Sequence, residues 1–171
     1  MTRILRGDFE TRSAVDLPKR GVHIYANDAS TDVWCFAYAF DDDPIKIWTQ
    51  GDSLPADLKN HIEQGGLFKA WNASFELAIW NSIMVPRYGW PVLRIDQCRC
   101  SMAAAGAMSL PLSLDKAAKA LSLDIEKDAE GYRLMLRMSK PRRINDIGEY
   151  VWWSEPARLK KLYSYCKQDV E

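Results

Sequence analysis

The stretch ILRGDFE, residues 4–10, decides the fold that we expect, because it reads as a first β-strand that carries two carboxylates. Successive side chains of a strand point to opposite faces, so Asp8 and Glu10 project to one side and Phe9 to the other, where a core can cover it. Neighbouring carboxylates raise each other's pKa and weaken the fold. A hard divalent cation would relieve this repulsion, since it takes carboxylate oxygens as ligands. Taken alone, the pair favours a solvated acidic strand end.

Composition indicates one ordinary globular domain. The chain has 171 residues, of which 47% are hydrophobic and 27% charged, enough for a domain with a real core. Lys and Arg together number 23, as do Asp and Glu, so the overall charge does not indicate nucleic-acid binding. Any such binding would need local patches of positive charge.

No apolar run approaches the ~20 residues that span a bilayer, and the N-terminus lacks a signal-peptide apolar region. We therefore expect a cytoplasmic protein without membrane contact, and a monomer is the default expectation. Cys35, Cys98, Cys100 and Cys166 include one C-x-C pair and no C-x-x-C pair, which speaks against a zinc site and for reduced thiols.

Hydrophobic periodicity and turn residues predict the order of the elements. Expected strands cover residues 4–10, 21–25, 32–40, 45–48 and 67–71. Expected helices cover residues 54–64, 73–84, 98–108 and 112–121, and a last one opens at Ser154; Pro86 should end the second, and residues 124–138 are mixed. This order predicts an α/β fold: a mixed sheet of about five strands, with an antiparallel meander and helices on its faces.

Two later stretches place polar side chains where α/β proteins build sites. WNASFEL, residues 71–77, joins a buried strand to a helix and puts Asn72 and Glu76 on one helix face. A structural role is equally compatible, with Asn72 as N-cap and Glu76 as a first-turn acid. YCKQD, residues 165–169, puts Tyr165 and Asp169 on one face of the last helix, which alone favours a solvent-facing pair.

Taken together, D-x-E, N-x-x-F-E and Y-x-x-x-D occur in this order along the chain. With them the sequence resembles the DnaQ-like 3′–5′ exonucleases of the RNase H-like fold, in the branch called DEDDy. It is most similar to the proofreading domains of phage-type family A DNA polymerases, through DFETRSAVDL at residues 8–17, AWNASFELAIW at 70–80 and KPRR at 140–143. The resemblance spans nearly the whole chain and implies a single exonuclease domain over residues 1–171.

The resemblance implies two divalent ions, Mg²⁺ or Mn²⁺, and a catalytic set made of Asp8, Glu10, Glu76, Tyr165 and Asp169. Asp8 would bridge the ions, Glu10 and Asp169 would bind the first, Glu76 would act on the second, and Tyr165 would orient the attacking water. Glu76 departs from the aspartate of most relatives, although phage-type relatives share it. Asp96 is a conceivable substitute ligand that matches no motif. The chain stops two residues after Asp169, so we expect a polymerase domain to follow in the complete chain.

The substrate implied is the 3′ end of single-stranded DNA. Phe9, through the nearby backbone, and Asn72 would contact the terminal nucleotide. Arg12 and Arg142, with Lys140 and Arg143, are candidates for phosphate contacts, although a solvated basic loop explains the last three equally well. One residue of the adjacent pair Trp152 and Trp153 could stack on a base, and core packing explains the other.

Three other interpretations stay open. The chain could be a free-standing DNA or RNA exonuclease, which downstream sequence would reveal. It could be a non-catalytic module of the same fold that binds nucleic acid or a polymerase body, which the presence of all four acids disfavours. It could also be an unrelated α/β domain whose motifs coincide.

Overall fold

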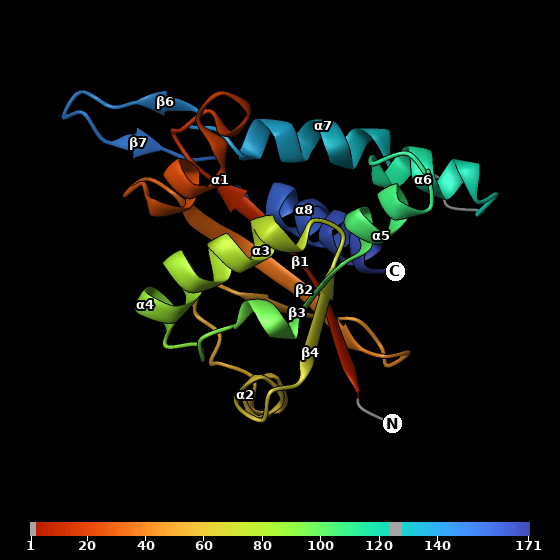
Figure 1. The fold of residues 1–171 in the computed structure, drawn as a ribbon. Coiled ribbons are helices and arrows are strands. Elements are labelled where there is room, and N and C mark those ends of the chain that lie inside the picture. The colour runs from red at the N-terminus through yellow and green to blue at the C-terminus, as the bar shows by residue number, and fades with distance from the viewer. Residues whose placement is uncertain (1–2, 124–127) are drawn as a thin grey trace.

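The computed structural model describes residues 3–123 and 128–171, built around one five-stranded sheet (Figure 1). The strands of this sheet are β1 Ile4–Arg12, β2 Asp32–Phe40, β3 Lys46–Thr49, β4 Leu67–Ala70 and β5 Cys98–Cys100. The helices are α1 Leu17–Asn27, α2 Ala56–Glu63, α3 Ala73–Ile79, α4 Val85–Tyr88, α5 Ser101–Ala107, α6 Leu114–Ala120, α7 Ala129–Met138 and α8 Pro156–Val170. A π-helical turn, Trp80–Met84, joins α3 to α4, and a 3₁₀ turn, Ile95–Gln97, precedes β5.

Strand β1 lies at the centre of the sheet, whose order is β3-β2-β1-β4-β5. It pairs antiparallel with β2 and parallel with β4, while β2–β3 is antiparallel and β4–β5 parallel. The predicted α/β fold, with a five-stranded mixed sheet, an antiparallel meander and flanking helices, is therefore confirmed.

The two faces of β1 have different neighbours. On one face Leu5 and Phe9 enter the main core, which Phe36 and Trp80 share. Gly7 lies between them because a Cβ there would come within 2.6 Å of the Phe36 ring. On the other face, β2 offers small residues beneath α8, so this helix can approach the strands closely: Cys35, Ala37 and Ala39 pack against Cys166 and Val170.

A β-bulge opposite the Glu10–Thr11 step reverses which side chains of β2 point to each face of the sheet. The register runs from Glu10 opposite Cys35 to Thr11 opposite Val33, so Trp34 is the extra residue. Trp34 turns toward α7 and α8, where its Nε1 donates to the carbonyl of Met138 at 3.1 Å. The bulge thereby ties the end of β1 and β2 to the helices on the α8 face.

Three local predictions were wrong. Residues 22–25 lie in the second part of α1, after a kink at Gly21, where φ is 76° and ψ is 163°. The first part begins at Asp16, which caps it by accepting from Lys19 N, and Pro18 fits its first turn. Residues 98–100 form strand β5, which pairs with β4, and the helix begins only at Ser101. Pro86 does not end its helix, because it lies in the first turn of α4, where it needs no backbone N–H partner.

A second, two-stranded sheet was not predicted. It consists of β6 Arg143–Ile144 and β7 Tyr150–Val151, joined by a turn that Asn145 and Gly148 close. Of the stretch expected to be mixed, residues 124–127 lie outside the described residues, and Asp128 caps α7. Within the described ranges, no helix is both long and apolar enough to cross a membrane.

Candidate metal centre

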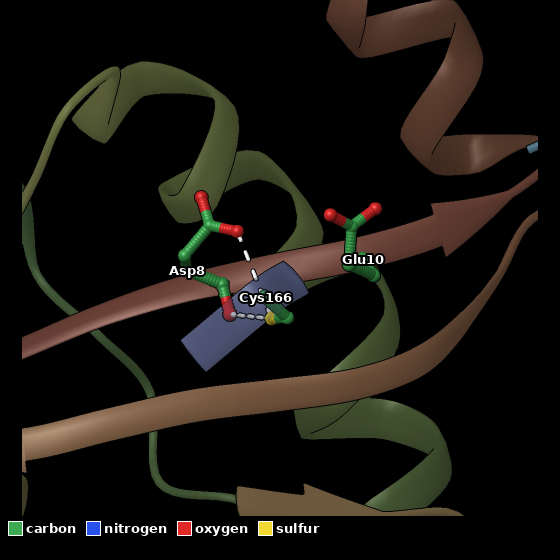
Figure 2. A group of neighbouring side chains, drawn as sticks. All are labelled: Asp8, Glu10 and Cys166. Carbon is green, nitrogen blue, oxygen red and sulfur yellow. Dashed lines mark hydrogen bonds between the residues drawn. The ribbon is translucent and has the colours of Figure 1, made fainter. Parts of the chain in front are cut away.

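Asp8 and Glu10 lie on the face of β1 that α8 covers, and their carboxylates point the same way (Figure 2). Glu10 is only 7% exposed and Asp8 is half-buried. One oxygen of each carboxylate and the Sγ of Cys166 lie within 4.8 Å of one another. The alternation of the strand thus puts both acids on one side, as predicted from the sequence.

Helix α8 brings Tyr165, Cys166 and Asp169 to the same place. The Sγ of Cys166 lies 3.4 Å from the backbone oxygen of Asp8 and 3.7 Å from its Oδ2. Tyr165 is buried at 9% exposure, and its hydroxyl hydrogen-bonds Asp169. The sequence-based expectation of a marginal, solvent-facing Tyr165 therefore does not hold.

Glu76 comes from the segment that follows β4, the parallel neighbour of β1. Arg6 of β1 pairs with Lys69 of β4, and β4 ends one residue later. The chain therefore leaves the sheet next to Asp8 and turns into α3. Glu76 lies in the first turn of α3, only 3% exposed, and its Oε2 has no hydrogen-bond partner among the described residues. A buried carboxylate oxygen without a donor is costly unless something else satisfies it.

The electrostatics show that these acids share one region of space. Burial and then the charge of Asp169 raise the pKa of Asp8 to about 8, against a weaker lowering by the Cys166 hydrogen bond. Burial and then the charge of Asp8 raise the pKa of both Glu10 and Glu76 well above the usual value. The charged neighbours that shift these three pKa values are Asp8, Asp169, Cys35 and Cys100, and all of them raise the values.

Tyr165 cannot act as a base in this setting. Burial first, and then the charges of Asp169 and Glu10, raise the pKa of its hydroxyl above the usual value. The hydroxyl therefore keeps its proton at neutral pH and acts through hydrogen bonds.

The arrangement fits a divalent cation. Asp8 and Glu10 place carboxylate oxygens close enough for one ion, and hard cations such as Mg²⁺ and Mn²⁺ prefer such oxygens. Glu76 and Asp169 interact with the charge of Asp8 and lie outside this group of ligand atoms. The unpartnered Oε2 of Glu76 and the mutual repulsion of the acids are deficits that a cation would relieve.

The residues expected at the substrate lie in different settings. The Phe9 side chain is 4% exposed and packs on Phe36 with ring centroids 4.3 Å apart, so only its backbone is available to a ligand. Asn72 occupies the N-cap position of α3 without a side-chain bond to the backbone, and its Oδ1 accepts from Ser74 Oγ at 2.8 Å. Asn72 thus precedes the helix that carries Glu76, while the Phe9 ring is part of the core.

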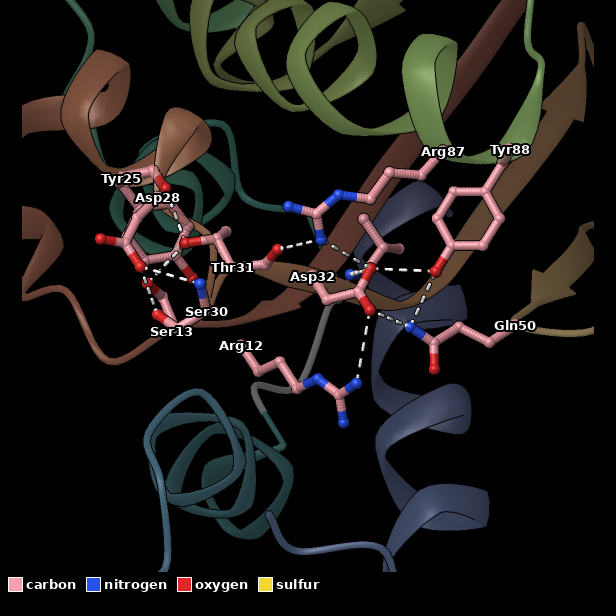
Figure 3. Close-up of polar contacts among 11 residues, drawn as sticks. Arg12, Ser13, Tyr25, Asp28, Ser30, Thr31, Asp32, Gln50, Arg87 and Tyr88 are labelled. Carbon is pink, nitrogen blue, oxygen red and sulfur yellow. Dashed lines mark hydrogen bonds and ion pairs between the residues drawn. The ribbon is translucent and has the colours of Figure 1, made fainter. Parts of the chain in front are cut away.

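Arg12 is held at the end of β1 in a polar network around Asp32 (Figure 3). Its Nη2 lies 3.4 Å from Asp32 Oδ2, and its guanidinium stacks 4.3 Å from the Trp34 ring centroid. Asp32 also accepts from Tyr88 at 2.9 Å and from Gln50 at 2.7 Å. These contacts give Arg12 a structural role, and a phosphate would have to share it with Asp32.

The other basic and aromatic candidates lie around the start of α8. Arg142 pairs with Glu155 at 3.3 Å and stacks 4.8 Å from the Trp153 ring, while Lys140 and Arg143 are exposed. Trp152 and Trp153 are partly buried against the Trp34 cluster rather than free. Asp96, the conceivable substitute ligand, is exposed and pairs with Arg94 at 3.0 Å, away from the acids.

Sequence reasoning missed Cys166 as a member of the cluster. The sequence indicates a reduced thiol at this position, and the structure shows that thiol to be free and buried. The signal that could have revealed it is its position between Tyr165 and Asp169 on a helix that covers Asp8.

Comparison with known proteins gives a homologue and a similar fold. No protein-family model matches the chain. The chain is 36% identical, over an alignment of 179 residues that covers 96% of it, to a DNA polymerase of Bacillus phage SP02. It spans only 26% of that polymerase, about a quarter of its length. This homology relates the chain to one part of a phage DNA polymerase.

A solved structure of a family B DNA polymerase from the archaeon Pyrobaculum calidifontis matches 99% of the chain with a TM-score of 0.54, over 23% of that polymerase. The sequence identity is 16%, so this likeness shows a common fold alone. It comes from family B, whereas the sequence resemblance pointed to family A, and the assignment to family A stays a prediction.

Proposed function

We propose that this chain is the 3′–5′ exonuclease domain of a phage-type DNA polymerase, which removes nucleotides from the 3′ end of single-stranded DNA in proofreading. The observation that carries the proposal is the group of buried carboxylates Asp8, Glu10 and Glu76, whose pKa values are raised by burial and by acidic neighbours, together with a Glu76 Oε2 that has no hydrogen-bond partner among the described residues. The homology to part of a phage DNA polymerase supports it. A polymerase domain in the same chain would be the partner.

The acids would divide the work by position. Asp8 lies among the other three and would hold both cations, Glu10 and Asp169 would hold the first, and Glu76 the second. Two divalent ions bound there would stabilise the attacking and leaving oxygens of an in-line phosphoryl displacement and would lower the pKa of bound water. Tyr165 keeps its proton and would hold the attacking water in line by a hydrogen bond. Asn72, at the start of α3, would contact the terminal nucleotide.

The test is the degradation of a single-stranded DNA oligonucleotide that carries a 5′ label, with Mg²⁺ or Mn²⁺. We expect a ladder that shortens from the 3′ end and disappears with EDTA and in Asp8→Ala. Tyr165→Phe should slow the reaction by about 10²-fold, the usual contribution of a positioned proton-carrying group. The matched control is Asp96→Ala, which removes an exposed acid outside the cluster and should leave the ladder unchanged.

Two results would contradict the proposal. A folded wild-type chain that yields no ladder with either metal, yet binds DNA, would instead support the non-catalytic module. A ladder that persists in Asp8→Ala would place the active site, or the activity, elsewhere.

A further inference from the structure

Cys166 is a soft ligand inside a cluster of hard ones. Its side chain is fully buried on α8, and its Sγ lies 3.7 Å from Asp8 Oδ2. With one oxygen of Asp8 and one of Glu10, it forms a group whose atoms are all within 4.8 Å of each other (Figure 2). Ligand atoms about 2.0–2.3 Å from one metal ion lie on the order of 3–4 Å apart, so small side-chain rotations would suffice to bring all three onto one ion.

A second observation points to a ligand at this cluster. Glu76 is 3% exposed, its Oε2 has no hydrogen-bond partner among the described residues, and its carboxylate interacts with the charge of Asp8. Buried carboxylates of this kind would accept a divalent ion of either class, hard or soft. The thiol decides which class gains an extra ligand.

We propose that Cys166, with Asp8 and Glu10, forms a binding site for thiophilic divalent cations of the zinc and cadmium class. The proposal shares one premise with the proposed function, namely that the cluster holds a divalent cation. Thiolates select such ions, whereas Mg²⁺ and Mn²⁺ prefer carboxylate and water oxygens. A thiophilic ion would bind Asp8, Glu10 and the sulfur of Cys166, whereas Mg²⁺ or Mn²⁺ would bind the same carboxylates without the sulfur. Ions of the two classes would therefore exclude each other.

The binding step balances without a redox partner. The S–H bond of Cys166 breaks, its proton goes to solvent, and a metal–sulfur bond forms. In the metal-free chain the Cys166 thiol donates to the backbone oxygen and Oδ2 of Asp8. A soft cation can displace this proton, because metal binding is coupled to ligand deprotonation.

The test measures the metal–sulfur bond itself. Cys98 and Cys100 are partly exposed and could bind cadmium, so the starting protein carries Cys98→Ser and Cys100→Ser. Titration with Cd²⁺ should produce the ultraviolet charge-transfer band of a cadmium–thiolate bond, saturating at about one ion per chain. Adding Cys166→Ser should abolish the band, and adding Asp8→Asn should raise the Cd²⁺ dissociation constant by at least about tenfold.

The matched control is Cys35→Ser, which removes the other fully buried thiol and leaves a hydroxyl in place of the sulfur that hydrogen-bonds Cys166. It should keep the band, because Cys35 does not belong to the ligand group formed by Asp8, Glu10 and Cys166. Circular dichroism would verify that each variant is folded, and Cys166→Ala would replace Cys166→Ser if the serine variant is not. A band that survives in the Cys166 variant, or no band in the folded starting protein, would overturn the proposal.

This outcome is separate from that of the nuclease assay. A chain that gives the band but cleaves no DNA would overturn the proposed function and leave the soft-metal site standing. A chain that degrades DNA with Mg²⁺ but gives no band would overturn only the role of Cys166.

Discussion

At the scale of single residues, the pKa of Asp8 is strongly raised by folding. Its pKa rises from 3.8 to about 8 on folding, chiefly through burial and then through Asp169. Between these two values the unfolded chain has lost the Asp8 proton while the folded chain keeps it. The free energy of unfolding of the metal-free protein should therefore fall as the pH rises from about 4 to about 8.

Asp8→Asn removes the part of this dependence that Asp8 contributes, because the amide does not titrate. In EDTA, the variant should gain stability relative to the wild type as the pH rises, on the order of 5 kcal/mol by about pH 8. Urea unfolding across this pH range would measure the difference. Asp96→Asn is the control, since the pKa of Asp96 is lowered by the Arg94 hydrogen bond and should give no such gain. An Asp8→Asn advantage that is independent of pH would contradict the explanation.

At the scale of elements, helix α7 fixes where Tyr165 lies. A Cβ at Gly131 would come 2.6 Å from Cδ2 of Tyr165 and would also crowd Asp128, the N-cap of α7. Gly131→Ala should therefore move the ring or push α7 away, although Gly131 bears no functional group. We expect a loss of about 1–3 kcal/mol in stability, typical of overpacking, together with slower cleavage.

Thermal unfolding and the 3′ ladder of the same Gly131→Ala sample would test this. The control is Gly106→Ala in α5, where the added Cβ meets only the end of the Leu112 side chain at 3.0 Å. That variant should unfold near the wild-type temperature and retain the wild-type ladder. Full activity in Gly131→Ala would show that α7 does not position Tyr165.

Local sequence signals predicted the elements that need no distant partner. Strand β2 and helix α2 follow from β-branched and aromatic density and from bracketing by Pro and Gly, and both were placed within a few residues. Strand β5 was missed because only pairing with β4 makes three residues a strand. Helix α1 was missed because the apolar alternation of residues 22–25 was given more weight than the cap at Asp16 and the Pro at its start.

The residues of the candidate site also fall into those that local sequence predicts and those that depend on tertiary structure. Strand alternation alone puts Asp8 and Glu10 on one side, so this pair was predictable from local sequence. That Glu76, Tyr165 and Asp169 meet them came from the family resemblance, since no local pattern tells which face of the sheet α8 covers. The burial of Tyr165 and the contact of Cys166 with Asp8 depend on the small residues of β2, and therefore on tertiary packing.

At the scale of the whole molecule, positive and negative residues balance, yet the fold gathers acids in one buried place. Lys and Arg together number 23, as do Asp and Glu, while burial and acidic neighbours raise the pKa values of Asp8, Glu10 and Glu76. A cation bound to the ionised acids would relieve their mutual repulsion. Stability and metal binding should be linked across the whole domain, because β1, α3 and α8 all contribute acids.

Mn²⁺ or Mg²⁺ should accordingly raise the unfolding temperature of the complete chain. A ligand at about 100 times its dissociation constant adds about 2.7 kcal/mol, or roughly 5–10 °C for a domain of this size. The rise should be larger near pH 8 than near pH 6, because Asp8, Glu10 and Glu76 have raised pKa values and must lose protons before they bind a cation. Differential scanning calorimetry at both pH values would measure it. Asp8→Asn should lose the rise and Asp96→Asn should keep it; an equal rise in both variants would mean that the cation binds outside the cluster.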